Sequence, residues 1–128
     1  MTFPKSIKST GKNDCLALES VYFANLDLVV GSEQGKTRPV IVISEDAINQ
    51  VLPIVNVIPI SSRKSGRKVH SNEVLLPSGT GGLEVESIAL CFQIRTLDKS
   101  RLTREIGRID DLKLQESILN ALRLQLGL

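Results

Sequence analysis

Arg38 is the residue whose type and setting point most directly to chemistry. It follows a polar stretch, residues 31–37, and precedes Pro39 and the apolar run at 40–43. Proline fixes its own φ and disfavours the helical region for the preceding residue, so we expect Arg38 to be extended at the mouth of a β-strand. A guanidinium held in that way suits phosphate, because its planar fork donates two parallel hydrogen bonds. An ion pair between Arg38 and Glu33 is the alternative.

Further basic residues gather in clusters along the chain. The net charge is only +2, which permits an anionic partner without demanding one. The clusters fall at predicted loops or strand ends, where their charges could converge, although many such clusters are only solvated loops. They are Lys36 with Arg38, Arg63 and Lys64 with Arg67 and Lys68, and the segment 99–108.

Histidine and cysteine limit the mechanisms open to this chain. His70 is the only histidine, which excludes a mechanism based on a histidine pair and a histidine-rich metal site. We expect His70 to lie on a solvated loop, with ligand contact as the alternative. Cys91 is expected to be a small buried hydrophobe and not a nucleophile, because no histidine is available to activate it.

The composition predicts one domain with an aliphatic core. A chain of 128 residues with three Phe, one Tyr and no Trp must build its core from Val, Ile and Leu, which favours strands. Two cysteines, no secretory leader and no apolar run near the roughly 18 residues of a membrane span indicate a reducing cytoplasm. Residues 1–17 lack periodicity and are predicted to be a mobile extension of a domain at 18–128.

The elements that would position Arg38 are predicted to be strands first and one helix last. Two long polar loops, 27–37 and 61–72, are expected to be binding elements. Pro59 suggests a bulge or a sheet edge. Ser44 or Asp46 would open a helical turn at 45–51, and Asp110 would be the N-cap of a C-terminal helix that ends near Gly127. The strands are expected at 21–26, 39–44, 54–60, 73–76 and 86–92, with a short sixth at 104–109.

Two sequence blocks resemble the MazF/PemK toxins. The first is Gly-Ser-Glu-Gln at 31–34, a short loop, and Arg-Pro-Val-Ile-Val-Ile at 38–43; the second spans 87–102 and contains Gln-Ile-Arg-Thr at 93–96. The resemblance runs from about Val21 to the C-terminus. It implies an α+β fold, a small SH3-like antiparallel β-barrel of the MazF/CcdB type with a C-terminal α-helix, and a two-fold homodimer.

The resemblance also implies a function. MazF/PemK toxins are ribosome-independent endoribonucleases, or mRNA interferases, of type II toxin–antitoxin systems. We therefore expect sequence-specific cleavage of single-stranded RNA without a metal or other cofactor, leaving a 2′,3′-cyclic phosphate and a 5′-hydroxyl. The expected partner is a MazE-like antitoxin whose acidic disordered tail covers the basic groove.

By the same resemblance, Arg38 matches the catalytic arginine and Ser61 the second catalytic position, where the family usually has threonine. Ser61 retains the hydroxyl needed to donate to a phosphate oxygen, although it could instead satisfy the backbone at a strand end. Ser62 is the substitute donor. Glu33 would act as a general base only if desolvated. The expected RNA-binding residues are Ser32, Glu33, Gln34, Lys36, Ser62, Arg63, Gln93 and Arg95.

Three departures from the family pattern leave a second class of function open. The segment 18–20 lacks the usual glycine, Phe92 stands where an acidic residue is common, and Ser61 replaces threonine. The alternative is therefore a catalytically weakened or inactive toxin fold that binds RNA, an antitoxin or a gyrase-type protein target. Arg95 has its own alternative, which is to tie loops together at a strand end.

Overall fold

The computed structural model describes residues 20–26 and 37–128, which form an antiparallel sheet and two α-helices. Three 3-10 turns are η3 (Thr80–Gly82), η4 (Cys91–Gln93) and η5 (Lys99–Arg101). None of the helices in these residues is long and apolar enough to cross a membrane. The other elements are β1 (Ser20–Asn25), β2 (Thr37–Val42), α1 (Asp46–Val51), β3 (Ile54–Ser62), β4 (Val74–Leu76), β5 (Ser87–Ala89), β6 (Arg95–Asp98), β7 (Leu102–Arg108) and α2 (Leu112–Leu126).

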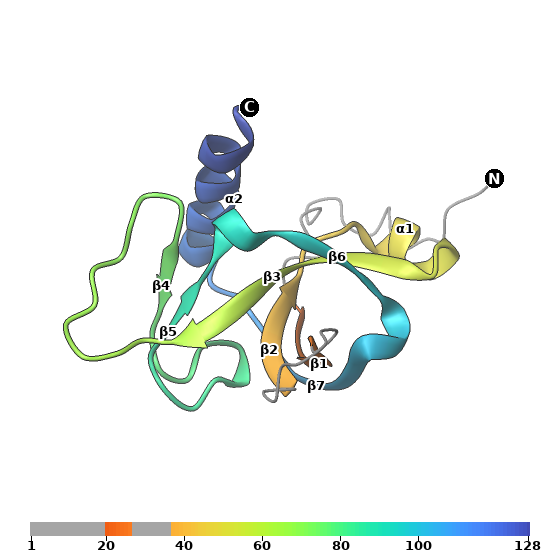
Figure 1. Cartoon of the computed structure of the whole chain (residues 1–128), viewed down its shortest axis with the longest axis horizontal. Helices are drawn as coiled ribbons and strands as arrows, with labels where there is room; N and C mark the ends of the chain where they lie inside the picture. The colour runs from red at the N-terminus through yellow and green to blue at the C-terminus, as the bar shows by residue number, and fades with distance from the viewer. Residues whose placement is uncertain (1–19, 27–36) are drawn as a thin grey trace, which may run out of the picture.

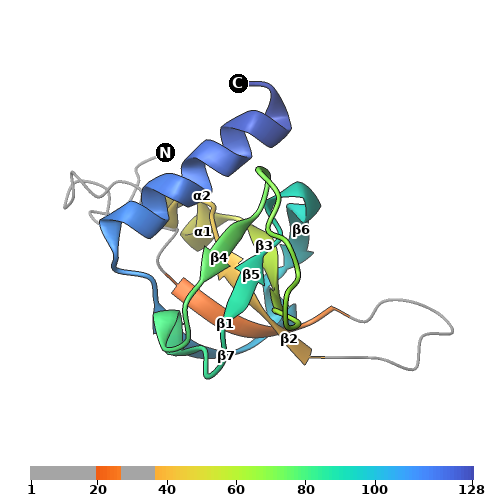
Figure 2. The same ribbon diagram turned by 90° about the vertical axis from the view of Figure 1, so that its left-hand side faces the viewer.

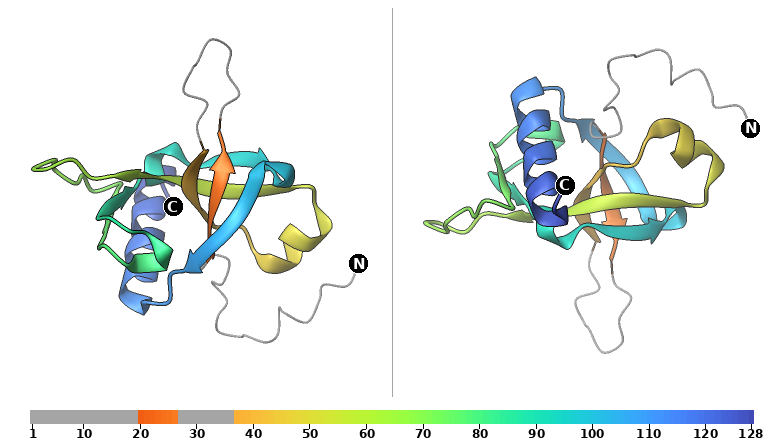
Figure 3. Two further views of the ribbon diagram at one scale, coloured as in Figure 1. Left: turned by 90° about the horizontal axis from the view of Figure 1, so that it is seen from below. Right: turned by 90° about the horizontal axis from the view of Figure 1, so that it is seen from above.

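The sheet is organised around β3, a strand of nine residues that crosses the middle of Figure 1. One edge of β3 pairs with β2, and the other pairs with β6 through residues 54–57 and with β5 through residues 60–62. The strand order is β4-β5-β3-β2-β1-β7, and both views in Figure 3 show β1 lying steeply across β3. Among the described strands no pairing closes the sheet into a barrel. The predicted α+β fold is therefore confirmed as an antiparallel sheet with a C-terminal helix.

Alternation along the strands produces an apolar cluster on each face of the sheet. The larger cluster is covered by α2, whose Ile118, Ala121 and Leu122 pack onto it. Figure 2 shows α2 lying along one side of the sheet, near β4. The strands contribute Val21, Ile41, Ile58 and Ile60 to this cluster, while Ala24, Val40, Val42, Val55, Val57 and Leu97 form the second cluster.

Pro59 lies inside β3 and not at a sheet edge. It pairs with Val40 of β2, and its carbonyl accepts a hydrogen bond of 2.9 Å from Leu90 N. The strand partners on that edge of β3 change there from β6 to β5, so the missing N–H of the proline coincides with a gap between two ladders. The predicted edge or bulge was therefore wrong in its position.

The predicted strand at 86–92 was also wrong in its extent. β5 ends at Ala89, the chain turns through η4, and β6 begins at Arg95. An unbroken apolar run does not reveal such a turn, because buried strands and buried turns have similar composition.

The N-caps of both helices differ by one residue from the predicted ones. The carboxylate of Asp111 accepts from Lys113 N at 2.8 Å and from Leu114 N at 3.3 Å, so Asp111 and not Asp110 is the N-cap of α2. Glu45 caps α1 by accepting from Ala47 N, in place of Ser44 or Asp46. Gly127 ends α2 with φ of 73°, as predicted for a C-terminal glycine.

Candidate functional site

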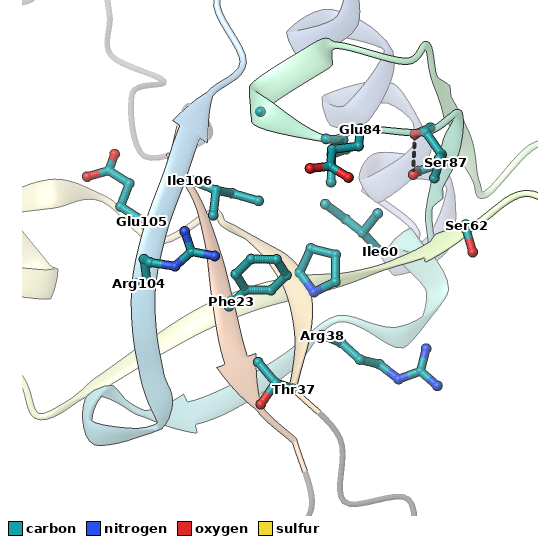
Figure 4. A pocket seen from close by; sticks show the side chains of 14 residues that line it. Phe23, Thr37, Arg38, Ile60, Ser62, Glu84, Ser87, Arg104, Glu105 and Ile106 are labelled. Carbon is teal, nitrogen blue, oxygen red and sulfur yellow. Dashed lines mark hydrogen bonds between the residues drawn. The ribbon is translucent and has the colours of Figure 1, made fainter.

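A cavity of about 660 Å³ opens beside Arg38, where the start of β2 and the end of β3 meet the middle of β1 and β7. Figure 4 shows Phe23 and Ile60 along its apolar floor. Pro39 also belongs to the lining. The segment 82–85, which begins at the last residue of η3, forms the opposite wall. The polar side chains on its lining are those of Thr37, Arg38, Ser62, Glu84, Ser87, Arg104 and Glu105.

The wall formed by residues 82–85 is held against β7 by a close backbone approach. Gly82 has φ of +84°, and a Cβ at this position would lie 2.1 Å from Ile106 O. Only glycine tolerates both the positive φ and that contact. This packing places Leu83 and Glu84 over the cavity.

Arg38 is exposed and extended within β2, as its position before Pro39 predicts. Its side chain makes no hydrogen bond or ion pair with any residue in the described part of the chain, and its guanidinium points away from Phe23 and Arg104 (Figure 4). The alternative pairing with Glu33 falls outside the described residues, as do the predicted RNA contacts Ser32, Glu33, Gln34 and Lys36. Arg38 therefore lines the cavity, and no described residue occupies its guanidinium donors, which are available to a ligand.

Ser61 and Ser62 lie on opposite faces of β3. Ser62 is exposed and lines the cavity with Arg38. Ser61 does not line the cavity, and its Oγ donates a long hydrogen bond of 3.4 Å to Ser62 O. The ladder between β2 and β3 pairs Val40 with Pro59; continued by two residues, this register places Ser61 opposite Arg38, on the same face of the sheet. Ser61 is thus the residue opposite Arg38 in the strand register, whereas Ser62 is the serine that shares the cavity lining with Arg38.

Arg63 is engaged in structure within the loop that follows β3. Its Nη1 lies 3.3 Å from Glu86 Oε1, and its Nε donates to Arg67 O at 2.9 Å. Arg67 in turn donates to both carboxylate oxygens of Glu73, at 3.0 and 2.9 Å. The predicted RNA contact Arg63 therefore has protein partners.

Glu73 is the buried centre of this loop. Its side chain is 2% exposed, and His70 N donates to it at 2.9 Å in addition to the two bonds from Arg67. The Arg67 hydrogen bonds hold the pKa of the Glu73 carboxyl below its usual range, against the opposing effect of burial. His70 itself is exposed, as predicted.

Gln93 and Arg95 lie away from the cavity. Gln93 is exposed at the end of η4, and Arg95 is half-buried in β6 opposite Val57. Ser61 is on the same face of β3 as Val57, the residue that pairs with Arg95, but it lies four residues further along the strand. At the rise of a β-strand, the backbone of Ser61 is therefore about 13 Å from that of Val57. The structure therefore does not bring Gln93 or Arg95 onto the lining that Arg38 and Ser62 share.

Three residues of the cavity were not singled out by sequence reasoning. The guanidinium carbon of Arg104 stands 5.0 Å from the centroid of the Phe23 ring, which is a cation–π distance. The basic cluster at 99–108 contained a signal for Arg104, but nothing in the sequence identified Phe23 or Glu84. Their relevance comes only from the folding of β1, β7 and η3 around one space.

The described cysteine and acidic residues give no sign of a further reactive centre. Cys91 is fully buried, as predicted, and burial raises the pKa of its thiol to about 12. In the described ranges no three His, Cys, Asp or Glu side chains group closely enough to hold a metal ion.

Comparison with known proteins gives one consistent family. A profile described as "PemK-like, MazF-like toxin of type II toxin-antitoxin system" matches residues 19–126. The chain is 41% identical over 108 residues to endoribonuclease EndoA of Bacillus subtilis, covering 84% of this chain and 91% of that protein. Among solved structures, the Mycobacterium tuberculosis toxin MazF-mt6 superposes with a TM-score of 0.69 at 24% identity, covering 85% and 97% of the two chains. A MazE–MazF complex from Deinococcus radiodurans superposes with a TM-score of 0.64 at 26% identity, covering 88% and 94%.

Proposed function

Since the chain belongs to the PemK-like, MazF-like family of toxins, we propose that it is the endoribonuclease toxin of a type II toxin–antitoxin system. The observation that carries this proposal is the 41% identity to an endoribonuclease over nearly its whole length. The exposed Arg38, with no partner among the described residues, supports it. The target is single-stranded RNA such as mRNA, because unstacked bases offer edges that a protein can read.

Cleavage without a metal requires that the protein neutralise a phosphorane and supply a hydrogen-bond donor. In the proposed reaction the 2′-oxygen attacks the adjacent phosphorus as its proton passes to water. The bond between phosphorus and the 5′-oxygen then breaks, and the leaving 5′-oxygen takes up a proton from water. Arg38 binds two phosphate oxygens while charge builds on them. A serine hydroxyl also donates to one of these two non-bridging oxygens. It belongs to Ser61, which the strand register places opposite Arg38, or to Ser62, which lines the cavity. The products are a 2′,3′-cyclic phosphate and a 5′-hydroxyl.

The assembly and location are proposed on the same basis. The toxin acts in the cytoplasm as a homodimer built from residues 18–128, with the bent sheet as an SH3-like, partly closed barrel. Its inhibitor is a MazE-like antitoxin, as in the Deinococcus complex, and an acidic disordered tail of that antitoxin would cover exposed cations such as Arg38. Ser32, Glu33, Gln34, Lys36, Gln93 and Arg95 extend the RNA path beyond the cavity.

The test is cleavage of a long single-stranded RNA by the purified protein in EDTA, with cut ends mapped by primer extension. Discrete cuts that persist in Arg123→Ala and disappear in Arg38→Ala are expected; Arg123 is an exposed cation on α2 and serves as the matched control. Ser61→Ala and Ser62→Ala, made separately, identify which hydroxyl takes part. A folded wild-type protein that cuts nothing would refute the nuclease function.

A toxin fold that only binds its target is the second candidate. The observation that favours it is Phe92, which is 39% exposed on η4, because an exposed aromatic side chain is typical of a protein-binding surface. Under this alternative, growth arrest by the protein would persist in the Arg38→Ala variant. Loss of growth arrest in that variant would exclude it.

A further inference from the structure

The cavity beside Arg38 contains a carboxylate that phosphate binding does not explain. Glu84 points into the space above Ile60 (Figure 4). Within the described residues only its main-chain oxygen is engaged, by Ser78 Oγ at 3.3 Å. Glu105 also belongs to the lining, but its carboxylate points away from the cavity in the same view.

These groups favour an uncharged, flat ligand with N–H donors. The Glu84 carboxylate would repel a phosphate in this space, and because it only accepts hydrogen bonds, the ligand must present donors to it. Pro39 and Ile60 offer apolar surface to a flat ring. Arg104, stacked on Phe23 at 5.0 Å, forms a side wall that can donate to ring nitrogens or carbonyl oxygens.

We propose that this cavity is a base-reading subsite for a nucleobase that carries an exocyclic amino group, namely adenine, cytosine or guanine. This inference rests on the proposed function, since the base belongs to the RNA whose phosphate Arg38 binds. The amino group of the base donates to Glu84. Uracil has a single donor on its base-pairing edge, N3–H, and the two carbonyl oxygens that flank it would face the carboxylate and oppose binding. A volume of about 660 Å³ lies in the range of pockets that hold small organic groups. Glu84 is thus a specificity-determining residue.

The experiment compares wild type with Glu84→Gln on one long RNA that contains many potential sites, with all cut ends counted by sequencing. The glutamine keeps the size of the side chain but adds N–H donors, so it can also bind uracil by donating to a carbonyl oxygen of that base. At one nucleotide position near the cut, wild type is expected to prefer amino-bearing bases over uracil by about tenfold or more, and the variant to lose most of that preference. Glu116→Gln is the matched control and keeps the wild-type pattern, because Glu116 is exposed on α2 and does not line the cavity.

The outcomes separate this inference from the proposed function. Wild type that cuts, with a Glu84→Gln variant that shows the same base frequencies at every position, overturns the subsite and leaves the nuclease intact. Wild type that never cuts overturns the nuclease, and the subsite is then decided by binding of 2′-O-methyl oligonucleotides, where equal affinity for uracil and amino-bearing bases refutes it. Loss of antitoxin binding in Glu84→Gln with unchanged base preference would assign the cavity to a protein partner.

Discussion

Two regions of this molecule use arginine in opposite ways. In the loop after β3, Arg63 and Arg67 are tied to Glu86 and Glu73, and their donors serve the loop itself. At the start of β2, Arg38 has no partner among the described residues. Both arginines of the loop are engaged by carboxylates, whereas the single arginine beside Pro39 is available to an anionic ligand. Whether a cation has a carboxylate partner is therefore more informative here than how many cations lie nearby.

Replacing Arg38 is the change expected to have the largest effect. Arg38→Ala should lower the rate of RNA cleavage about 10²- to 10³-fold, because a preorganised donor to the developing phosphate charge is removed. Arg38→Lys should recover only part of this rate, since an ammonium cannot form the bidentate contact. Single-turnover cleavage in EDTA measures both.

The same change should leave stability nearly untouched. Arg38 is exposed and unpaired within the described part of the chain, so the free energy of unfolding in urea should stay within about 0.5 kcal/mol of wild type. A large loss of stability in Arg38→Ala would mean that the arginine has a structural partner, and the comparison between the two regions would fail.

The loop should respond in the reverse manner. Glu73→Ala removes the carboxylate that accepts from Arg67 and from His70 N, and should cost about 1–2 kcal/mol of unfolding free energy, because the loop loses these three hydrogen bonds while water can still reach the Arg67 guanidinium. The matched control is Glu86→Ala, which breaks an exposed pair and should cost about 0.5 kcal/mol. Equal losses in urea titrations of the two variants would show that Glu73 is not the centre of the loop.

The contribution of Glu73 to the unfolding free energy should depend on pH. The Arg67 hydrogen bonds lower the pKa of Glu73 from its ordinary value of 4.5, so the ionised carboxyl stabilises the fold fully above that value, and this contribution is lost as pH falls through the lower folded-state pKa. Wild type should therefore lose more unfolding free energy between pH 5 and acid than Glu73→Gln does. Asp98, whose pKa is lowered by hydrogen bonds from Ser100, is common to both proteins and cancels. Parallel pH profiles would contradict the assignment.

The features that sequence reasoning predicted well are those with a local cause. Pro39 alone makes Arg38 extended, and Gly127 alone ends α2, so both predictions needed no knowledge of the fold. The Glu73 centre could not be predicted, because it forms only when the loop folds and brings Arg67 and His70 N onto the carboxylate. The strand predicted at 86–92 failed for a related reason: composition distinguishes buried from exposed segments but not a strand from a turn. Glu84 became a candidate only once η3 was seen to pack against β7.

The smallest expected effect tests the prediction that Arg63 binds RNA. Its guanidinium is already engaged by Glu86 and by Arg67 O, so Arg63→Ala should barely change the salt dependence of RNA affinity. Lys64 and Lys68 are exposed in the same loop and have no ion pair among the described residues. Replacing both by alanine should weaken binding by about two- to fivefold and reduce the slope of log K against log salt by about 0.7 for each phosphate that is no longer neutralised. If Arg63→Ala lowered the slope as much as a lysine change, the ion pair with Glu86 would have to open when RNA binds, and a partnered arginine in this loop would be as available as Arg38.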